Sequence, residues 1–267
     1  MSYPSALHDV LDRVIVPVGE LARQEGKFPR AAVTALGRAG LLGLTCSAEP
    51  AGRGADLARA AEVVAQVLPV CPAMAAVLQS HYAAAAVVEA SGGRWLRGEV
   101  AAGRHLCTLA VVEDGAGGAV RSTARRTGGV VALRARKRDV VAAGEADSYV
   151  WSSPPVASDG GLTLWGVPAH APGLFVPARA TGVPLASATS TVVADPVRVP
   201  VEAVLGADGE GFEILLGAVL PWLLELCAVV GADAVHPSLG ALARSASGAA
   251  RTGDGQAFAA SSAMALR

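Results

Sequence analysis

The sequence predicts an α+β chain of three parts: an N-terminal α-helical domain over residues 1–105, a central antiparallel β-barrel domain over 106–204 and a C-terminal helical segment over 205–267. Three observations support this order. Apolar residues recur at helical spacing through the first hundred residues. From Leu106 the pattern changes to short Val-rich runs separated by Gly, Pro and Asp, which is typical of antiparallel strands. After Gly211 a long apolar stretch restores the helical pattern.

The first domain is predicted to be helical throughout, and turn residues mark most helix ends. The first helix carries its apolar face at Val10, Leu11, Val14, Ile15, Val18 and Leu21. Proline suits the first turn of a helix, so Phe28-Pro29 opens the second helix, which ends at Gly43. Asp56 is placed to cap a third helix, and Pro72 starts a fourth. A short helix over Trp95–Ala102 closes the domain.

The central domain is predicted from short runs of β-branched residues. These strands cover Leu109–Val112, Val130–Leu133, Tyr149–Trp151, Leu162–Val167, Leu174–Val176 and Thr191–Val193. Asp159-Gly160-Gly161 predicts a hairpin turn, because glycine accepts the positive φ that such turns need. The run from Ala194 to Pro200 is expected to be a strand that ends at a proline. The glycine-rich run from Gly206 to Gly211 then turns the chain into the final helix.

Composition sets the broad class of the protein. With 267 residues, 52% hydrophobic content and a net charge of -1, the chain can bury a sizeable core and gives no electrostatic reason to expect a nucleic acid or an anionic membrane as partner. Its four cysteines are scattered without a C-x-x-C pair, and its histidines show no metal-ligand spacing. The N-terminus lacks the pattern of a signal peptide. We therefore expect a cytoplasmic protein without a bound metal.

The stretch from Ile214 to Ala232 is nearly long enough and apolar enough to cross a bilayer. Pro221 and Glu225 lie in its middle, and a central acidic residue adds about 2.5–3.5 kcal/mol to the cost of insertion. No cluster of Lys or Arg follows the stretch. A helix buried inside a protein assembly is therefore the better interpretation.

Several motifs resemble those of the acyl-CoA dehydrogenases. Gly26-Lys27-Phe28-Pro29 is similar to the family's G-x-F-P, and the run from Leu36 to Leu44 is similar to its L-x-x-x-G-L-x-G. The segment from Asp195 to Phe212 resembles the family's D-V-x-V-P-x-x-x-L-L-G-x-x-G-x-G. The resemblance covers Val10 to Gly231 and implies the family's order of helices, β-domain and helices. In that family three further long helices follow, so the resemblance also implies a truncated final domain.

The resemblance implies FAD as cofactor and assigns it a set of positions. These positions are Leu109, Val111, Val112, Gly117, Gly118, Asp139 and Val141. Most have lost the family's side chains. The family has a Thr and a Ser near the flavin, and this chain has Val112 and Gly118 at those two positions. Lys137 matches a family lysine. In the family, an aromatic residue two positions later and a Thr four positions later contact the isoalloxazine, and Asp139 and Val141 stand at these positions here. Main-chain N–H groups remain available to a flavin.

Dehydrogenation of an acyl thioester also needs a carboxylate that removes a proton while a flavin takes the hydride. Most family members supply this base from beyond the end of this chain, and a minority supply it from an E-R pair in the first C-terminal helix. Pro221-Trp222 occupies the position of that pair here. Glu225 lies one turn later and is the candidate base, because burial in an apolar helix makes a carboxylate more basic. The alternative is an acid on the helix face with a structural role.

The resemblance implies FAD-dependent α,β-dehydrogenation of an acyl-CoA or acyl-carrier-protein thioester. It also implies a partner chain, either in a homo-oligomer or in a hetero-oligomer with a full-length relative. The alternative is a non-catalytic homologue, structural, regulatory or degenerate, that has lost FAD binding. The concentration of losses at the cofactor positions supports that alternative. A third possibility is a pocket in the β-domain that serves non-redox chemistry.

Two further features have competing interpretations. The basic run from Arg134 to Arg138 fits a phosphate or nucleic-acid patch, or a solvated strand edge. The near-neutral chain and the absence of interleaved aromatic residues favour the strand edge. His81, on the Ala-rich fourth helix, is expected to be a packing histidine.

Overall fold

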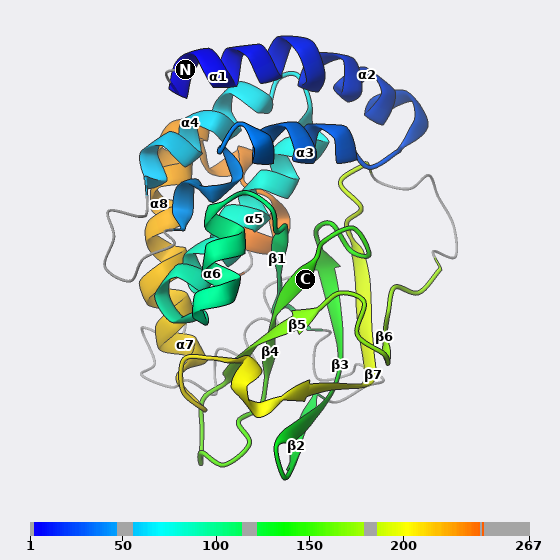
Figure 1. Cartoon of the computed structure of the whole chain (residues 1–267), viewed down its shortest axis with the longest axis vertical. Coiled ribbons are helices and arrows are strands. Elements are labelled where there is room, and N and C mark those ends of the chain that lie inside the picture. Colours follow the sequence, from blue (N-terminus) through cyan, green and yellow to red (C-terminus); the bar gives the residue numbers. More distant parts are fainter. Residues whose placement is uncertain (1–2, 47–55, 114–121, 179–185, 241, 243–267) are drawn as a thin grey trace.

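The computed structural model describes residues 3–46, 56–113, 122–178, 186–240 and 242, and it places a group of helices beside a two-sheet domain (Figure 1). The predicted order of helices, β-domain and helices is confirmed. The helices are α1 (Tyr3–Val10), α2 (Val16–Glu25), α3 (Arg30–Arg38), α4 (Leu57–Val67), α5 (Pro72–Ser91), α6 (Arg94–Ala101), α7 (Gly211–Ile214) and α8 (Leu220–Val230). Single π-helical turns join α1 to α2 and α7 to α8, so each pair forms one longer helix.

The strands form two four-stranded sheets. Their bounds are β1 (Cys107–Ala110), β2 (Thr123–Thr127), β3 (Val130–Val140), β4 (Ser148–Ser153), β5 (Thr163–Pro168), β6 (Leu174–Phe175), β7 (Ser190–Pro200) and β8 (Val204–Leu205). One sheet has the order β1-β4-β5-β8 and the other β2-β3-β7-β6. Within the described residues the sheets do not close, so the expected barrel is two open sheets. Strands β1 and β4 are parallel, because the chain crosses to the second sheet and returns between them.

Strand β7 continues past the predicted Val193 and through Pro196, and it ends at Pro200, so the expected strand end at a proline is confirmed. The register between β3 and β7 shifts between Leu133 and Ala135, so Asp195 and Pro196 together face Arg134. A proline has no N–H to give to a strand ladder, and a bulge is a position where that loss costs little.

Other boundaries also differ from the predicted ones. Strand β3 continues past the expected Leu133 to Val140, through the whole basic run. The polar strand β2 was not predicted, because it lacks apolar alternation and is defined by its pairing with β3. Helix α3 ends at Arg38 rather than at Gly43. The predicted cap of α4 is confirmed, since Asp56 accepts a hydrogen bond from the Arg59 N–H at 3.1 Å.

Asp208 ties the loop between β4 and β5 to the turn before α7. Its carboxylate accepts hydrogen bonds from the main-chain N–H groups of Val156, Ala157 and Ser158 and from the Thr163 hydroxyl. Burial raises the pKa of Asp208, but these hydrogen bonds outweigh it and hold the pKa well below its ordinary value. The turn predicted at Asp159-Gly160-Gly161 lies within this longer loop, where Gly161 has a φ of 88°.

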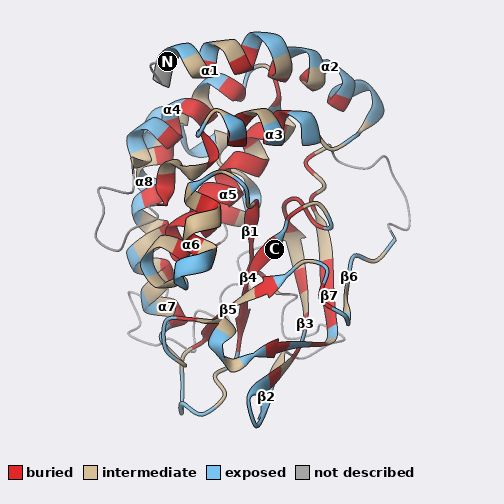
Figure 2. Cartoon of the chain, in the orientation of Figure 1, coloured by how far each residue is buried: buried red, intermediate tan, exposed pale blue. Residues whose placement is uncertain are grey.

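Helix α5 is buried on nearly every side and lies between the other helices and the first sheet (Figures 1 and 2). His81 on this helix is completely buried, as expected of a packing histidine. Its Nε2 lies 3.0 Å from the Leu42 carbonyl oxygen and its Nδ1 lies 3.1 Å from the Cys107 carbonyl oxygen. Burial lowers the pKa of His81 to about 4, although both carbonyl groups act to raise it.

The continuous helix Gly211–Val230 is, by length and composition, able to cross a membrane, and 28% of its most apolar window is buried in the protein. One face packs on α4 and α5 through Leu215, Val219, Trp222, Leu223 and Leu226. On the other face Leu224 is 64% exposed and Val229 is 42% exposed. The described residues of this chain therefore cover only half of the helix, and burial of its other face in an assembly stays a prediction.

His81 makes the stability of this fold depend on pH. Its pKa is about 4 when folded and near 6.5 when unfolded, so the unfolded chain binds the proton more readily. We expect this contribution, about 3 kcal/mol in the free energy of unfolding, to be present above pH 6.5 and to be lost as the pH falls towards 4. Urea unfolding measured across this range should show the loss. It should be absent in His81→Gln and retained in the control His8→Gln, whose imidazole is exposed. Equal pH profiles for the protein and His81→Gln would refute the assignment.

Candidate functional site

The residues assigned to a cofactor by the sequence gather where the chain leaves β1 and runs beside the end of β3. Glu113 and Lys137 form an antiparallel bridge there. The Arg138 N–H donates a hydrogen bond to the Val112 carbonyl at 3.0 Å. Tertiary structure thus brings the segment around Val112 next to the strand that leads to Asp139.

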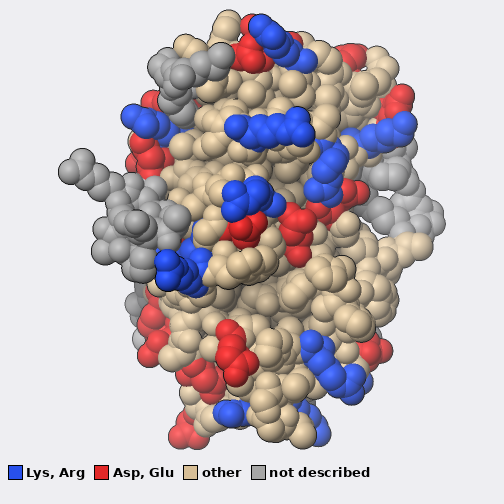
Figure 3. Space-filling model, in the orientation of Figure 1, with Lys and Arg blue, Asp and Glu red and all other residues tan. Residues whose placement is uncertain are grey.

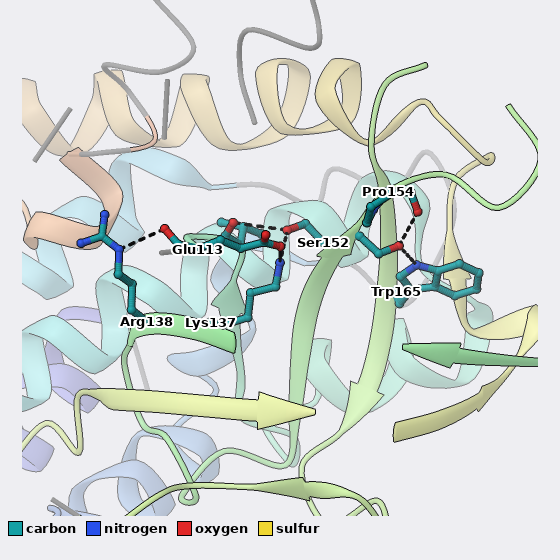
Figure 4. A network of polar contacts seen from close by, with 8 residues as sticks. Glu113, Lys137, Arg138, Ser152, Pro154 and Trp165 are labelled. Carbon is teal, nitrogen blue, oxygen red and sulfur yellow. Dashed lines mark hydrogen bonds and ion pairs between the residues drawn. The ribbon is translucent and has the colours of Figure 1, made fainter. Parts of the chain in front are cut away.

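Lys137 is the buried centre of this region (Figure 4). Its Nζ donates hydrogen bonds to Glu113 Oε1 and, at 2.7 Å, to Ser152 Oγ. The same atom lies 5.4 Å from the centre of the Trp151 ring, in cation–π range. Burial lowers the pKa of Lys137, while the Glu113 carboxylate acts to raise it. A fully enclosed lysine thus depends on one counter-charge, whose own side chain is 34% exposed.

The side chains at the assigned positions do not fit a flavin in the family's manner. Val112 and Val141 are 3% and 1% exposed and belong to the hydrophobic core, as do Leu109 and Val111. Asp139 has a positive φ of 54°, and its carboxylate lies 3.6 Å from Arg138 Nη1. None of these side chains offers a hydroxyl or a ring to a flavin. Gly117 and Gly118 lie outside the described residues. A flavin at this place would be held by main-chain groups.

Glu225 is on α8, whose contacts are with α4 and α5 (Figure 1). Its side chain is only partly buried, so the enclosed apolar environment expected for a base is absent in the single chain. The segment after α8 does approach the end of β3. The main-chain N–H of His236 donates a hydrogen bond to Gln79 Oε1 at 2.7 Å. Burial lowers the pKa of the His236 imidazole, and the nearby charge of Asp139 opposes this only in part. Sequence spacing gives no signal for this pair.

Two buried polar atoms on β1 and β4 have no signal in the sequence. Thr108 Oγ1 and Trp151 Nε1 have no hydrogen-bond partner among the described residues. Thr108 pairs with Tyr149, two residues before Trp151, so both side chains lie on the same side of these strands. An unpaired buried donor costs about 1–3 kcal/mol, so a polar group bound there would be stabilised.

A cavity of about 390 Å³ lies elsewhere, between α3 and the connection from α6 to β1. Arg30, Arg38, Arg104, His105 and Asp147 contribute its charged and polar lining. Arg30 pairs with Glu145 and Arg104 pairs with Glu99, each at 2.6 Å. Acidic and basic side chains are interspersed over this part of the surface (Figure 3). The cavity holds none of the assigned cofactor positions. Among the described residues no group of three or more His, Cys, Asp or Glu is placed to hold a metal ion.

The buried pair predicts an asymmetric response to mutation. Glu113→Gln leaves the Lys137 ammonium buried without its counter-charge, and we expect it to lower the free energy of unfolding by about 3 kcal/mol. Adding Lys137→Met should restore part of this loss, because no buried charge then remains. Glu99→Gln breaks an exposed pair and serves as the control. Chemical unfolding of the unmodified protein, the two single variants and the double variant tests this. A double variant with a lower free energy of unfolding than Glu113→Gln would contradict it.

Comparison with known proteins agrees with this architecture. Residues 4–99 match the family model "Acyl-CoA dehydrogenase, N-terminal domain". An acyl-CoA dehydrogenase of Bacillus subtilis (strain 168) is 24% identical over 222 residues, which are 79% of this chain and 58% of the relative. The mitochondrial short-chain specific acyl-CoA dehydrogenase of Mus musculus is 26% identical over 78% of this chain and 53% of its own length. The chain thus spans little more than half the length of these relatives.

Solved structures share the fold. Butyryl-CoA dehydrogenase from Megasphaera elsdenii superposes with a TM-score of 0.72 at 19% identity, covering 92% of this chain and 67% of that one. FkbI, described for biosynthesis of a methoxymalonyl extender unit, gives a TM-score of 0.62 at 23% identity, covering 97% of this chain and 82% of that one. Together, the N-terminal domain match, the curated relatives and the shared fold show that this chain is acyl-CoA dehydrogenase-like.

Proposed function

We propose that the protein is a flavin-dependent oxidoreductase that removes hydrogen from the α and β carbons of an acyl thioester, carried on CoA or on an acyl-carrier protein. The observation that carries this proposal is the fold, which matches butyryl-CoA dehydrogenase over 92% of this chain. A similar structure of TdsC from Paenibacillus sp. A11-2, with a TM-score of 0.70 at 19% identity, contains FMN. These likenesses support a flavin, for which we propose FAD.

The proposed reaction needs a carboxylate base, and Glu225 is our candidate. It lies on the half-covered helix α8, next to the exposed Leu224. A second chain that covered this face would enclose Glu225 in apolar surroundings, where a carboxylate is a stronger base. The proposal therefore links catalysis to association.

A non-catalytic homologue is the second candidate, and specific residues favour it. Asp139 stands where the family has an aromatic residue, and the buried Val112 and Val141 stand where it has hydroxyls. An aspartate beside a reduced, electron-rich flavin is electrostatically unfavourable. These replacements leave the main chain as the source of flavin contacts.

We also propose a cytoplasmic location. All four cysteines are free, and Cys46, Cys71 and Cys107 are buried. Burial raises the pKa of Cys46 to about 12, so this thiol is protonated and unreactive. Free buried thiols suit a reducing compartment.

The visible absorption spectrum of the purified protein, before and after addition of FAD, tests the cofactor. We expect a flavin band that stays with the protein after gel filtration, because main-chain contacts do not depend on the lost side chains. Asp139→Trp should strengthen FAD binding by restoring the ring. Arg126→Trp, at an exposed position of strand β2 in the β2–β3 hairpin, is the control. A colourless protein that retains no FAD, alone or with a full-length relative, would support the non-catalytic homologue. If the band is present, Glu225→Gln should abolish turnover without removing it.

Association through α8 is tested by light scattering during gel filtration. We expect the 26.7-kDa chain to elute as an oligomer, because exposed apolar surface of this kind is stabilised by burial. Leu224→Glu with Val229→Glu should shift it towards the monomer. Val16→Glu with Leu21→Glu, which changes equally exposed residues at α2, should leave the mass unchanged. A soluble monomer of the unmodified chain would contradict the proposal.

A further inference from the structure

The outer face of the second sheet carries arginines that the proposed redox chemistry does not use. Ala132 in β3 pairs with Arg125 in β2 on one side and with Arg198 in β7 on the other. Residues paired across strands point to the same face, so both arginines flank Ala132. Arg134, two residues further along β3, points to that face as well. We call Arg125, Arg134 and Arg198, with Ala132 at their centre, the arginine face.

Burial confirms which way these side chains point. Val131 and Leu133, on either side of Ala132, are 1% and 0% exposed, whereas Arg125, Arg134 and Arg198 are exposed. In β7 the neighbours of Arg198, Val197 and Val199, are likewise buried. The core therefore lies on one side of the sheet and the arginine face on the other.

Charge on this face is poorly balanced. Arg134 pairs with Asp195 at 3.0 Å. Neither Arg125 nor Arg198 has an ion-pair partner among the described residues, and the Ala132 side chain between them carries no charge. In a chain of net charge -1, such a local excess of positive charge complements a negative partner rather than reflecting an overall basic protein.

Spacing identifies the kind of partner. Arg125 and Arg198 are two strand separations apart, about 10 Å. Carboxylates at positions i and i+7 of an α-helix are also about 10 Å apart along its axis. A third carboxylate at i+4 lies on the same helical face, within reach of the long Arg134 side chain. The guanidinium group has five donors, so Arg134 can hold Asp195 and a second carboxylate together.

We propose that the arginine face docks an acidic α-helix of a partner protein that presents carboxylates at i, i+4 and i+7. Duplex nucleic acid is a poorer occupant, because the chain as a whole is not basic. The docking is independent of flavin binding, so its test needs no catalytic activity.

Two fluorescent helical peptides of identical composition provide the test, measured by anisotropy at about 50 mM salt, where surface charges are weakly screened. One peptide carries Glu at i, i+4 and i+7, and the other distributes the same Glu residues around the helix. The protein should bind the first about tenfold more tightly. The triple variant Arg125→Gln/Arg134→Gln/Arg198→Gln should lose this preference.

The matched control is Arg13→Gln/Arg23→Gln/Arg59→Gln, which removes the same charge from exposed helical positions. It should bind both peptides as the unmodified protein does. Circular dichroism establishes that both triple variants are folded. The proposal would be overturned if the two peptides bound with equal affinity, or if the control variant lost the preference for the first peptide to the same extent. Tighter binding to duplex DNA or to anionic lipid vesicles than to the first peptide would also overturn it.

Discussion

Four consecutive polar residues of α5, Gln79 to Tyr82, connect this buried helix to the segments around it. Ser80 Oγ accepts the Leu109 N–H of β1 at 3.2 Å, and Tyr82 donates to the Leu41 carbonyl at 2.6 Å. His81 lies between the Leu42 and Cys107 carbonyls. The side-chain amide of Gln79 forms hydrogen bonds with the turn after α8, and the main-chain carbonyl of Gln79 accepts the Trp222 indole N–H at 3.2 Å. Each bond satisfies a group that burial would otherwise leave unpaired, so the helices, β1 and the C-terminal helix are positioned by one element.

This arrangement separates the scaffold from the cofactor positions. The residues that connect α5 to its neighbours lie in segments that match the family's domain and fold. The assigned flavin positions lie at the end of β3 and after β1, where Val112 and Val141 have become part of the core. A fold can therefore be retained while its cofactor contacts change, because different residues serve the two purposes.

Strand β3 shows how one alternating pattern serves two environments. Lys137 points inward, where Glu113 and Ser152 satisfy it, while Arg134 points outward beside Asp195. The basic run is thus neither a uniform patch nor a simple solvated edge. One of its cations is enclosed, and the others face away from the core. The expected strand edge is wrong, because β3 lies inside its sheet between β2 and β7. Arg134 is exposed to solvent as expected, whereas Lys137 is completely buried.

The sequence by itself determined the family, the order of helices and strands, the cap at Asp56 and the packing role of His81. These follow from local spacing, capping chemistry and motifs, which do not depend on distant contacts. Only the tertiary structure decided the open sheets, the unpredicted strand β2, the passage of β7 through Pro196 and the partner of Lys137. It also decided that Asp208 joins two loops and that Asp139 influences His236. Strand pairing and buried charge are set by residues far apart in the chain, because a strand partner or a counter-charge is chosen only when the chain folds.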